Sequence, residues 1–285
     1  MLALFSTTLL AVSFSVSYSY EYGVDTSWPV HHSFLGTNPS LSKTIQLFRG
    51  EKIDLYYNYV QGCKERYADK AHQCTHNEEE RLMLNRNQPK QMTNYTDIGY
   101  KKVRLSDELF TAIREFWQET MDNGGIEKLE EEYWPPANTY TNHWASPTKM
   151  KDCSALHAPI WKEVEAQVKE WIPKAKSFSR SSLYGIRVYQ QDSILATHVD
   201  RDPLITSAII NVDQDVLNMY EPWPLEVYGH DGRAQNITMI PGDMVLYESH
   251  SVLHGRPFPM KGKYYANIFV HFKPIFDEDE SHEEL

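Results

Sequence analysis

The segment THVDRD places His198 and Asp200 two residues apart, directly after a stretch with strand-like composition. Side chains at positions i and i+2 of an extended chain point to the same side, so this pair could bind one metal ion. A third ligand must come from elsewhere, and the segment SHSVLHGRP offers His254, with His250 as the rival. A His-x-Asp pair alone is a common surface feature, so it is evidence for a metal site only together with the segments around it.

Strand-like segments surround these residues in a definite order. A segment bearing Tyr189 leads into the pair in YGIRVYQQDSILATHVD, and a second such segment, ITSAIINVD, follows it. A turn and a further strand precede His254 in MIPGDMVLYES, and KGKYYANIFVHF comes after it. In this order and spacing, residues 180–273 resemble the catalytic domain of the 2-oxoglutarate- and Fe(II)-dependent dioxygenases of the prolyl 4-hydroxylase type.

The resemblance implies a double-stranded β-helix, or jelly roll, in which His198, Asp200 and His254 bind Fe(II). Two histidines and one carboxylate leave three positions of an octahedron open, as in non-haem Fe(II) oxygenases. The open positions are expected to take 2-oxoglutarate, as cosubstrate, and O₂. Ascorbate is expected as a further cofactor.

The far carboxylate of 2-oxoglutarate needs a cation, because a buried carboxylate without a partner is costly. The resemblance points to Lys263, nine residues after His254, with Arg256 and Lys261 as competitors. It also implies that Tyr189 hydrogen-bonds the same carboxylate; the alternative is that Tyr189 is an ordinary core aromatic.

Composition excludes several classes of protein. Of the 285 residues, 41% are hydrophobic and 24% are charged, so the chain can form a packed core and is not globally disordered. The net charge of -11 argues against a nucleic-acid partner.

The N-terminal residues 1–19 carry no charge, and Leu2 to Val16 has the length of the apolar region of a signal peptide. Ser17 and Ser19 are small residues that suit cleavage after Ser19. An uncleaved anchor and a buried N-terminal element are the alternatives. We expect no stable membrane span, because the run is short and rich in Ser and Thr.

Residues 276–285 form an acidic tail that ends in His-Glu-Glu-Leu. This ending is similar to the tetrapeptides that a retention receptor of the endoplasmic reticulum binds. Sequons at Asn94 and Asn236 agree with a glycoprotein in that lumen. We therefore expect a luminal protein with this receptor as a partner; an acidic tail that ends in Leu by chance is the alternative.

The three cysteines are too few for a disulfide-dense scaffold. Cys63 and Cys74 enclose a short polar stretch that a bridge would close into a small loop, which leaves Cys153 over. Three reduced thiols are the alternative. His72 and His76 have a helical spacing that suits a metal, but no third ligand is evident near them.

The chain divides into regions of different composition and sequence pattern. Residues 20–100 are polar and irregular apart from an expected helix over residues 51–67, and their role is open. Within residues 101–178, apolar positions at helical spacing predict helices over 106–119 and 159–172. Residues 179–275 hold β-rich runs separated by turns, which is typical of a sandwich or barrel. We predict an α+β fold: a jelly roll backed by helices, with a helical and irregular N-terminal extension.

Hydroxylation of a polypeptide at proline in the secretory pathway is the favoured function. Trp223 and Tyr220 are the rings that could stack on proline. The same chemistry on lysine or a small molecule is the second hypothesis, and a non-catalytic jelly-roll interaction protein is the third. A zinc hydrolase would leave the distal cation unexplained. Leu195 stands three residues before His198, where many prolyl hydroxylases carry tyrosine, and it leaves the substrate open.

Overall fold

The computed structural model of the chain describes residues 51–125, 140–217 and 222–277. The expected signal segment at residues 1–19 and residues 278–285 of the acidic tail lie outside the described residues. No helix among the described residues is long and apolar enough to cross a membrane.

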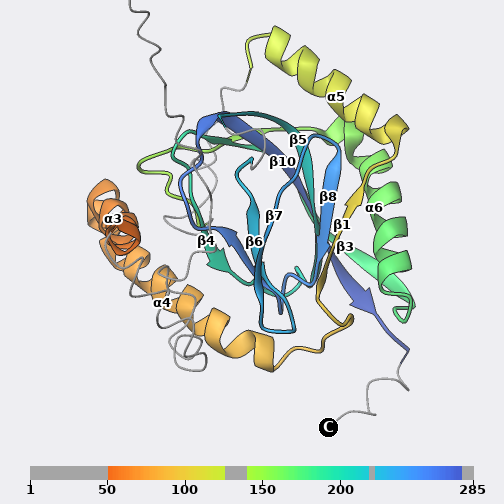
Figure 1. The fold of residues 1–285 in the computed structure, drawn as a ribbon, viewed down its shortest axis with the longest axis horizontal. Coiled ribbons are helices and arrows are strands. Elements are labelled where there is room, and N and C mark those ends of the chain that lie inside the picture. The colour runs from red at the N-terminus through yellow and green to blue at the C-terminus, as the bar shows by residue number, and fades with distance from the viewer. Residues whose placement is uncertain (1–50, 126–139, 218–221, 278–285) are drawn as a thin grey trace, which may run out of the picture.

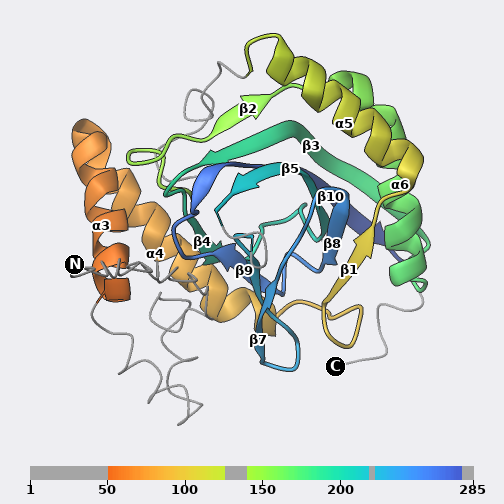
Figure 2. The same ribbon diagram turned by 45° about the horizontal axis from the view of Figure 1, so that its top comes forward.

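Two antiparallel sheets form the centre of the fold. The six-stranded sheet has the order β1-β8-β5-β10-β3-β2 and the four-stranded sheet has the order β4-β9-β6-β7. The larger sheet comprises β1 (Tyr100–Arg104), β2 (Lys149–Lys151), β3 (Ser177–Gln190), β5 (Thr206–Val216), β8 (Asp243–Tyr247) and β10 (Gly262–Ile275). The smaller sheet comprises β4 (Leu195–His198), β6 (Leu225–Tyr228), β7 (Ala234–Ile237) and β9 (Leu253–Arg256). They lie face to face around a shared interior (Figure 2), as predicted for a jelly roll.

Two helices cover the outer face of the six-stranded sheet (Figure 1). Helix α5 (Asp107–Asp122) begins after Ser106, whose hydroxyl accepts a hydrogen bond from the backbone N–H of Leu109. Helix α6 (His157–Trp171) ends just before Pro173, as predicted. Buried apolar positions recur at helical spacing in both: Leu109, Ile113 and Trp117 in α5, and Ile160, Val164 and Val168 in α6.

Strand β10 shows how the sheet separates its two faces. Ala266, Ile268 and Val270 join the core beneath the helices. Tyr265 and Phe269 instead join the aromatic and apolar side chains on the other face, between the sheets. This alternation follows from the period of two in a strand, and it directs polar and aromatic side chains into the shared interior.

The N-terminal region contains more structure than the sequence predicted. Helix α3 (Glu51–Arg66) matches the expected helix, but α4 (Ala71–Asn87) occupies a stretch predicted to be irregular. A Cys63–Cys74 disulfide joins the two helices with a Cα–Cα distance of 6.0 Å, which confirms the expected bridge. Figure 1 shows this hairpin beside β4, on the opposite side of the molecule from α5 and α6.

Candidate metal centre and its cavity

The three predicted metal ligands lie together. His198 ends β4 and is paired with His254 of β9 in the antiparallel ladder, and their ring centroids are 4.3 Å apart. Asp200 follows β4, and its Oδ1 lies 3.5 Å from Nε2 of His198 and 4.0 Å from Nε2 of His254. One ligand atom from each residue lies within 4.8 Å of the others, close enough to hold one ion.

Backbone carbonyls fix the orientation of both imidazoles. Nδ1 of His198 donates to the carbonyl of Ala196 at 2.8 Å, and Nδ1 of His254 donates to that of Val252 at 2.9 Å. Since a carbonyl only accepts, the proton of each neutral ring lies on Nδ1. The lone pair of each Nε2 therefore faces Asp200 and is available to a metal.

The surroundings also favour the metal-binding protonation states. Burial alone would raise the pKa of Asp200, but the neighbouring imidazoles of His198, His254 and His271 hold it well below its usual range. Burial and the proximity of His198 lower the pKa of His254 to about 3. At neutral pH the carboxylate is therefore ionised and His254 is neutral, the forms that coordinate a cation.

The donor set fits a divalent transition metal. Oδ2 of Asp200 is buried and has no hydrogen-bond partner in the described part of the chain. Nδ1 of His271 lies 3.6 Å from this oxygen and 2.6 Å from the Ser207 hydroxyl. Two imidazoles and one carboxylate suit Fe(II) and leave coordination positions open.

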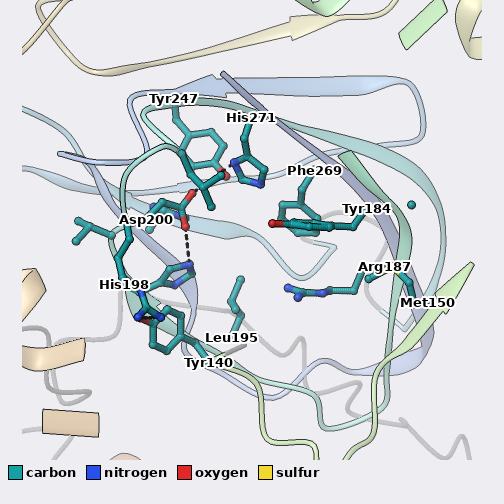
Figure 3. Close-up of a pocket in the computed structure, with 15 residues that line it drawn as sticks. Tyr140, Met150, Tyr184, Arg187, Leu195, His198, Asp200, Tyr247, Phe269 and His271 are labelled. Atoms are coloured by element: carbon teal, nitrogen blue, oxygen red, sulfur yellow. Dashed lines mark hydrogen bonds and ion pairs between the residues drawn. The ribbon is translucent and has the colours of Figure 1, made fainter. Parts of the chain in front are cut away.

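A cavity of about 190 Å³ adjoins these residues. Figure 3 shows Tyr184 and Phe269 on one side of the cavity and Leu195 and Tyr140 on another. The Tyr184 side of the cavity reaches the surface, since Tyr184 is 47% exposed. The site is therefore buried but open to a substrate.

A buried cation lies on the same strand as His254. Arg256 is fully buried, and its Nε donates to the carbonyl of Trp223 at 3.2 Å. Its guanidinium carbon is 4.9 Å from the ring centroids of both Trp223 and Tyr265. Nη1 and Nη2 of Arg256 and the hydroxyl of Tyr265 have no hydrogen-bond partner among the described residues. Buried donors without partners are costly, and a carboxylate ligand would satisfy both nitrogens at once.

Tyr247 connects this cation with the metal centre. Its ring packs edge-on against His254, with 4.6 Å between centroids. Burial and the charge of Asp200 raise the pKa of Tyr247, while the charge of Arg256 acts in the opposite direction. His254 and Arg256 also lie two residues apart on β9, so the two halves of the site are adjacent.

Lys263 does not belong to this site, which corrects our choice of anchor. Its side chain is 83% exposed and pairs with Asp215 at 2.8 Å on the surface. The pairing of β10 with β5 shifts register between Gly262 and Tyr264. Gly262 has a φ of +145°, and a Cβ there would lie 2.3 Å from the carbonyl oxygen of Asp215. The strand is therefore irregular at the very residue whose direction the prediction depended on.

Of the other predicted residues, some lie in the aromatic cluster around Arg256 and some lie outside the cavity. Lys261 pairs with Asp192 at 2.8 Å, outside the cavity. Tyr189 is fully buried against Trp223, with ring centroids 4.9 Å apart, and therefore belongs to the aromatic cluster around Arg256. Trp223 is itself fully buried, so it is not the exposed ring expected to stack on proline. Tyr220, the second such ring, lies outside the described residues.

Sequence reasoning missed several residues that line the cavity. Arg187 points into it and donates from Nη1 to the Tyr189 hydroxyl at 3.3 Å (Figure 3). The spacing of two between Arg187 and Tyr189 in a predicted strand is a signal that could have revealed it. Tyr140, whose ring centroid is 4.6 Å from that of His198, belongs to no helix or strand and gave no such signal.

A comparison with solved structures found several to which this chain is similar. The chain is similar to a prolyl 4-hydroxylase from Pseudomonas putida, with 15% identity and a TM-score of 0.44, over 62% of this chain and 92% of that one. A prolyl hydroxylase from Trichoplax adhaerens, in complex with a peptide fragment of the oxygen degradation domain of hypoxia inducible factor, gives 15% identity and a TM-score of 0.42, over 73% and 94%. HygX from Streptomyces hygroscopicus, with nickel, 2-oxoglutarate and hygromycin B bound, gives 12% identity and a TM-score of 0.44, over 67% and 88%.

A scan against protein-family models found no match, and neither did a search of curated proteins. The identities and TM-scores of the solved structures are low. The assignment of fold and chemistry therefore rests on this chain's own strand pairing and side chains.

Proposed function

We propose that this protein is an Fe(II)- and 2-oxoglutarate-dependent dioxygenase that hydroxylates a polypeptide at proline. The observation that carries the proposal is the pairing, within one interior, of an open His198/Asp200/His254 centre with the buried guanidinium of Arg256. A metal centre alone would suit many reactions. The addition of a buried cation with two unsatisfied donors fits a cosubstrate that is itself a dicarboxylate.

In this proposal each part of the chain has a distinct task. His198, Asp200 and His254 hold Fe(II), and Arg256 holds the far carboxylate of 2-oxoglutarate. When bound, iron and cosubstrate supply the oxidising power: 2-oxoglutarate and O₂ are converted to succinate and CO₂ as the second oxygen atom enters a substrate C–H bond. The burial of His254 and Tyr247 excludes water from the metal centre, which limits side reactions.

The lining of the cavity favours proline over lysine. The rings of Tyr140, Tyr184 and Phe269 offer faces on which a pyrrolidine ring can pack. Two arginines, Arg187 and Arg201, line the same cavity, and its carboxylate is Asp200, which is engaged at the metal centre. A lysine ammonium would therefore meet cations without a free counter-ion, whereas proline is uncharged. Its fixed φ also lowers the ordering cost of an extended ligand.

The reaction is tested with the purified full chain, Fe(II), ascorbate and 2-oxoglutarate. Proline-containing peptides, the same peptides with alanine at proline, lysine-containing peptides and free amino acids are compared by mass spectrometry. We expect one added oxygen per modified proline and one succinate per oxygen. Coupled oxidation of lysine or of a small molecule, with the proline peptides inert, would transfer the proposal to those substrates. A metal-loaded protein that releases no succinate with any of them would favour the non-catalytic alternative.

We further propose that the protein resides in the lumen of the endoplasmic reticulum. The uncharged N-terminal segment and the His-Glu-Glu-Leu ending support this, and a disulfide is typical of such oxidising compartments. Asn94 of the first sequon is exposed, as a glycosylated asparagine must be. Deleting residues 282–285 should release the protein to the medium, and glycosidase should lower its apparent mass. A cytosolic, glycosidase-insensitive protein that the deletion does not affect would contradict the proposal.

A further inference from the structure

Helix α4 contacts the metal-binding segment with polar side chains, an unusual way to dock a helix. Its buried residues are Cys74, Glu78, Arg81 and Asn85, spaced so that they form one stripe along the helix. A helix that serves only to cover a sheet normally buries Leu, Val or Ile on that stripe. We call Arg81, Asn85 and the following Gln88 the α4 polar stripe, because all three reach the same stretch of backbone.

That stretch lies at the edge of the smaller sheet and is buried. Strand β4 is the edge strand in the order β4-β9-β6-β7; its outer side is bridged to Thr141 at Leu195, but beyond that no strand of the described residues pairs with it. The chain from Thr197 to Asp200 carries two of the three metal ligands. Unpaired N–H and C=O groups there would leave the ligand backbone free to shift.

The α4 polar stripe supplies the missing partners. Nδ2 of Asn85 donates to the carbonyl of Thr197 at 2.9 Å, and Oδ1 of Asn85 accepts from the N–H of Val199 at 3.1 Å. One side-chain amide thus pairs with the backbone on either side of His198, as a neighbouring strand would. Arg81 also donates to the carbonyl of Thr197, through Nη1 at 2.5 Å.

Gln88 extends the contact to the second half of the centre. Its Nε2 donates to the carbonyl of Asp200 at 2.6 Å and to the carbonyl of His250 at 2.8 Å. His250 lies in the turn before β9, which carries His254. A single amide therefore connects the segment that bears His198 and Asp200 with the segment that leads to the third ligand.

The stripe is itself held rigidly. Arg81 and Asn85 are each 1% exposed, and Glu78 binds Arg81 with Nη2–Oε1 at 2.6 Å and Nε–Oε2 at 2.9 Å. Glu78 also accepts a hydrogen bond from the Tyr56 hydroxyl of α3 at 2.9 Å. Burying this ion pair costs desolvation free energy that apolar packing would avoid, so its value lies in fixed geometry.

We propose that Asn85 and Gln88 are positioning residues for the metal centre. Together with Arg81 they hold the backbone of Thr197–Asp200 so that the ligand atoms of His198 and Asp200 converge on His254. The inference rests on the proposed function, because it requires that the centre bind a metal. It gives the α3–α4 hairpin, whose role the sequence left open, an indirect part in the reaction through the backbone of the metal ligands.

The test compares matched pairs on α4 and on the 3-10 turn that follows it. Asn85→Ala and Gln88→Ala remove the contacts, whereas Asn87→Ala and Gln91→Ala remove exposed side chains of the same types nearby. Binding of Co(II) to the apoprotein is measured by titration and by its visible absorption spectrum. We expect a loss of affinity of roughly tenfold or more and an altered spectrum for the first pair, with wild-type behaviour for the second.

Hydrogen exchange of the apoprotein gives a readout that needs neither metal nor turnover. In Asn85→Ala the amide of Val199 should exchange at least several-fold faster, while amides in α6 keep their wild-type rates. Faster exchange throughout the chain would mean general destabilisation and would overturn a positioning role, as would wild-type Co(II) affinity in both Asn85→Ala and Gln88→Ala. If the wild-type protein itself binds no Co(II) while remaining folded, the proposed function fails, and this inference fails with it for that separate reason.

Discussion

His254 and Arg256 project from the same face of strand β9, two residues apart. Their Cα atoms are therefore about 7 Å apart along the strand, from its rise per residue. His254 faces the metal centre and the guanidinium of Arg256 faces the aromatic cluster. The backbone of the strand thus fixes the two side chains relative to each other. In the proposed function, this strand would set the distance between the metal ion and the group that binds the far carboxylate of 2-oxoglutarate.

The anchor role of Arg256 predicts a selective loss of cosubstrate binding in Arg256→Met. Removing one partner of a buried charged pair costs about 3–5 kcal/mol, so the affinity for 2-oxoglutarate should fall on the order of 100-fold or more. The apoprotein should keep its stability or gain some, because methionine leaves no unsatisfied donors. Isothermal titration with 2-oxoglutarate and thermal unfolding of the apoprotein measure the two effects.

Lys263→Met is the matched control for that substitution. The Lys263–Asp215 pair is exposed, and such pairs contribute little to stability. We expect wild-type affinity for 2-oxoglutarate and an unchanged unfolding temperature. A larger loss of cosubstrate affinity in Lys263→Met than in Arg256→Met would restore the original assignment.

The metal role of the paired histidines predicts that His254→Ala loses stoichiometric iron. Only one imidazole and one carboxylate would remain, too few ligands for a stable site. The protein is reconstituted with Fe(II) in the absence of oxygen, and its iron content is then measured by elemental mass spectrometry. His76→Ala, at an exposed position of α4, is the control and should bind as much iron as the wild type. Equal iron in His254→Ala and His76→Ala would exclude His254 as a ligand.

The sequence revealed part of the site through a local rule and part through a resemblance. The spacing of two between His198 and Asp200, at the end of β4, predicted that both could bind one ion. The choice of His254 rather than His250 as the third ligand came from the resemblance of residues 180–273 to a known dioxygenase family. Lys263 was misplaced because a register shift at Gly262 interrupts the alternation of β10, and sequence spacing alone does not locate such irregularities.

The contribution of α4 was hidden for a different reason. Its buried stripe carries Glu78, Arg81 and Asn85, residues that sequence reasoning assigns to solvent. Their burial becomes intelligible only when the unpaired edge of β4 is seen beside them. Helices α5 and α6 were predicted from hydrophobic periodicity. A helix whose buried side chains are polar, because they hydrogen-bond the backbone of an edge strand, shows no such periodicity.

The helices behind the large sheet should determine stability rather than chemistry. Ile160 of α6 is fully buried, so Ile160→Ala should lower the free energy of unfolding by about 2–5 kcal/mol through lost burial and a cavity. Urea denaturation measures this change. Lys162→Ala, at an exposed position two residues on, should alter it by no more than about 0.5 kcal/mol. Similar losses in both variants would mean that α6 does not pack on the sheet as described.

The state of the three cysteines can be read from thiol labelling. Cys153 is fully buried, and burial together with the charge of Asp152 raises the pKa of its thiol to about 12. At pH 8 the thiol therefore stays protonated and unreactive, because the thiolate is the reacting species. The native protein should take up no iodoacetamide at that pH, the unfolded unreduced protein one equivalent, and the unfolded reduced protein three, since Cys63 and Cys74 form a disulfide. Three equivalents without reductant would show that the α3–α4 bridge is not formed, and rapid labelling of the native protein would show that Cys153 is accessible.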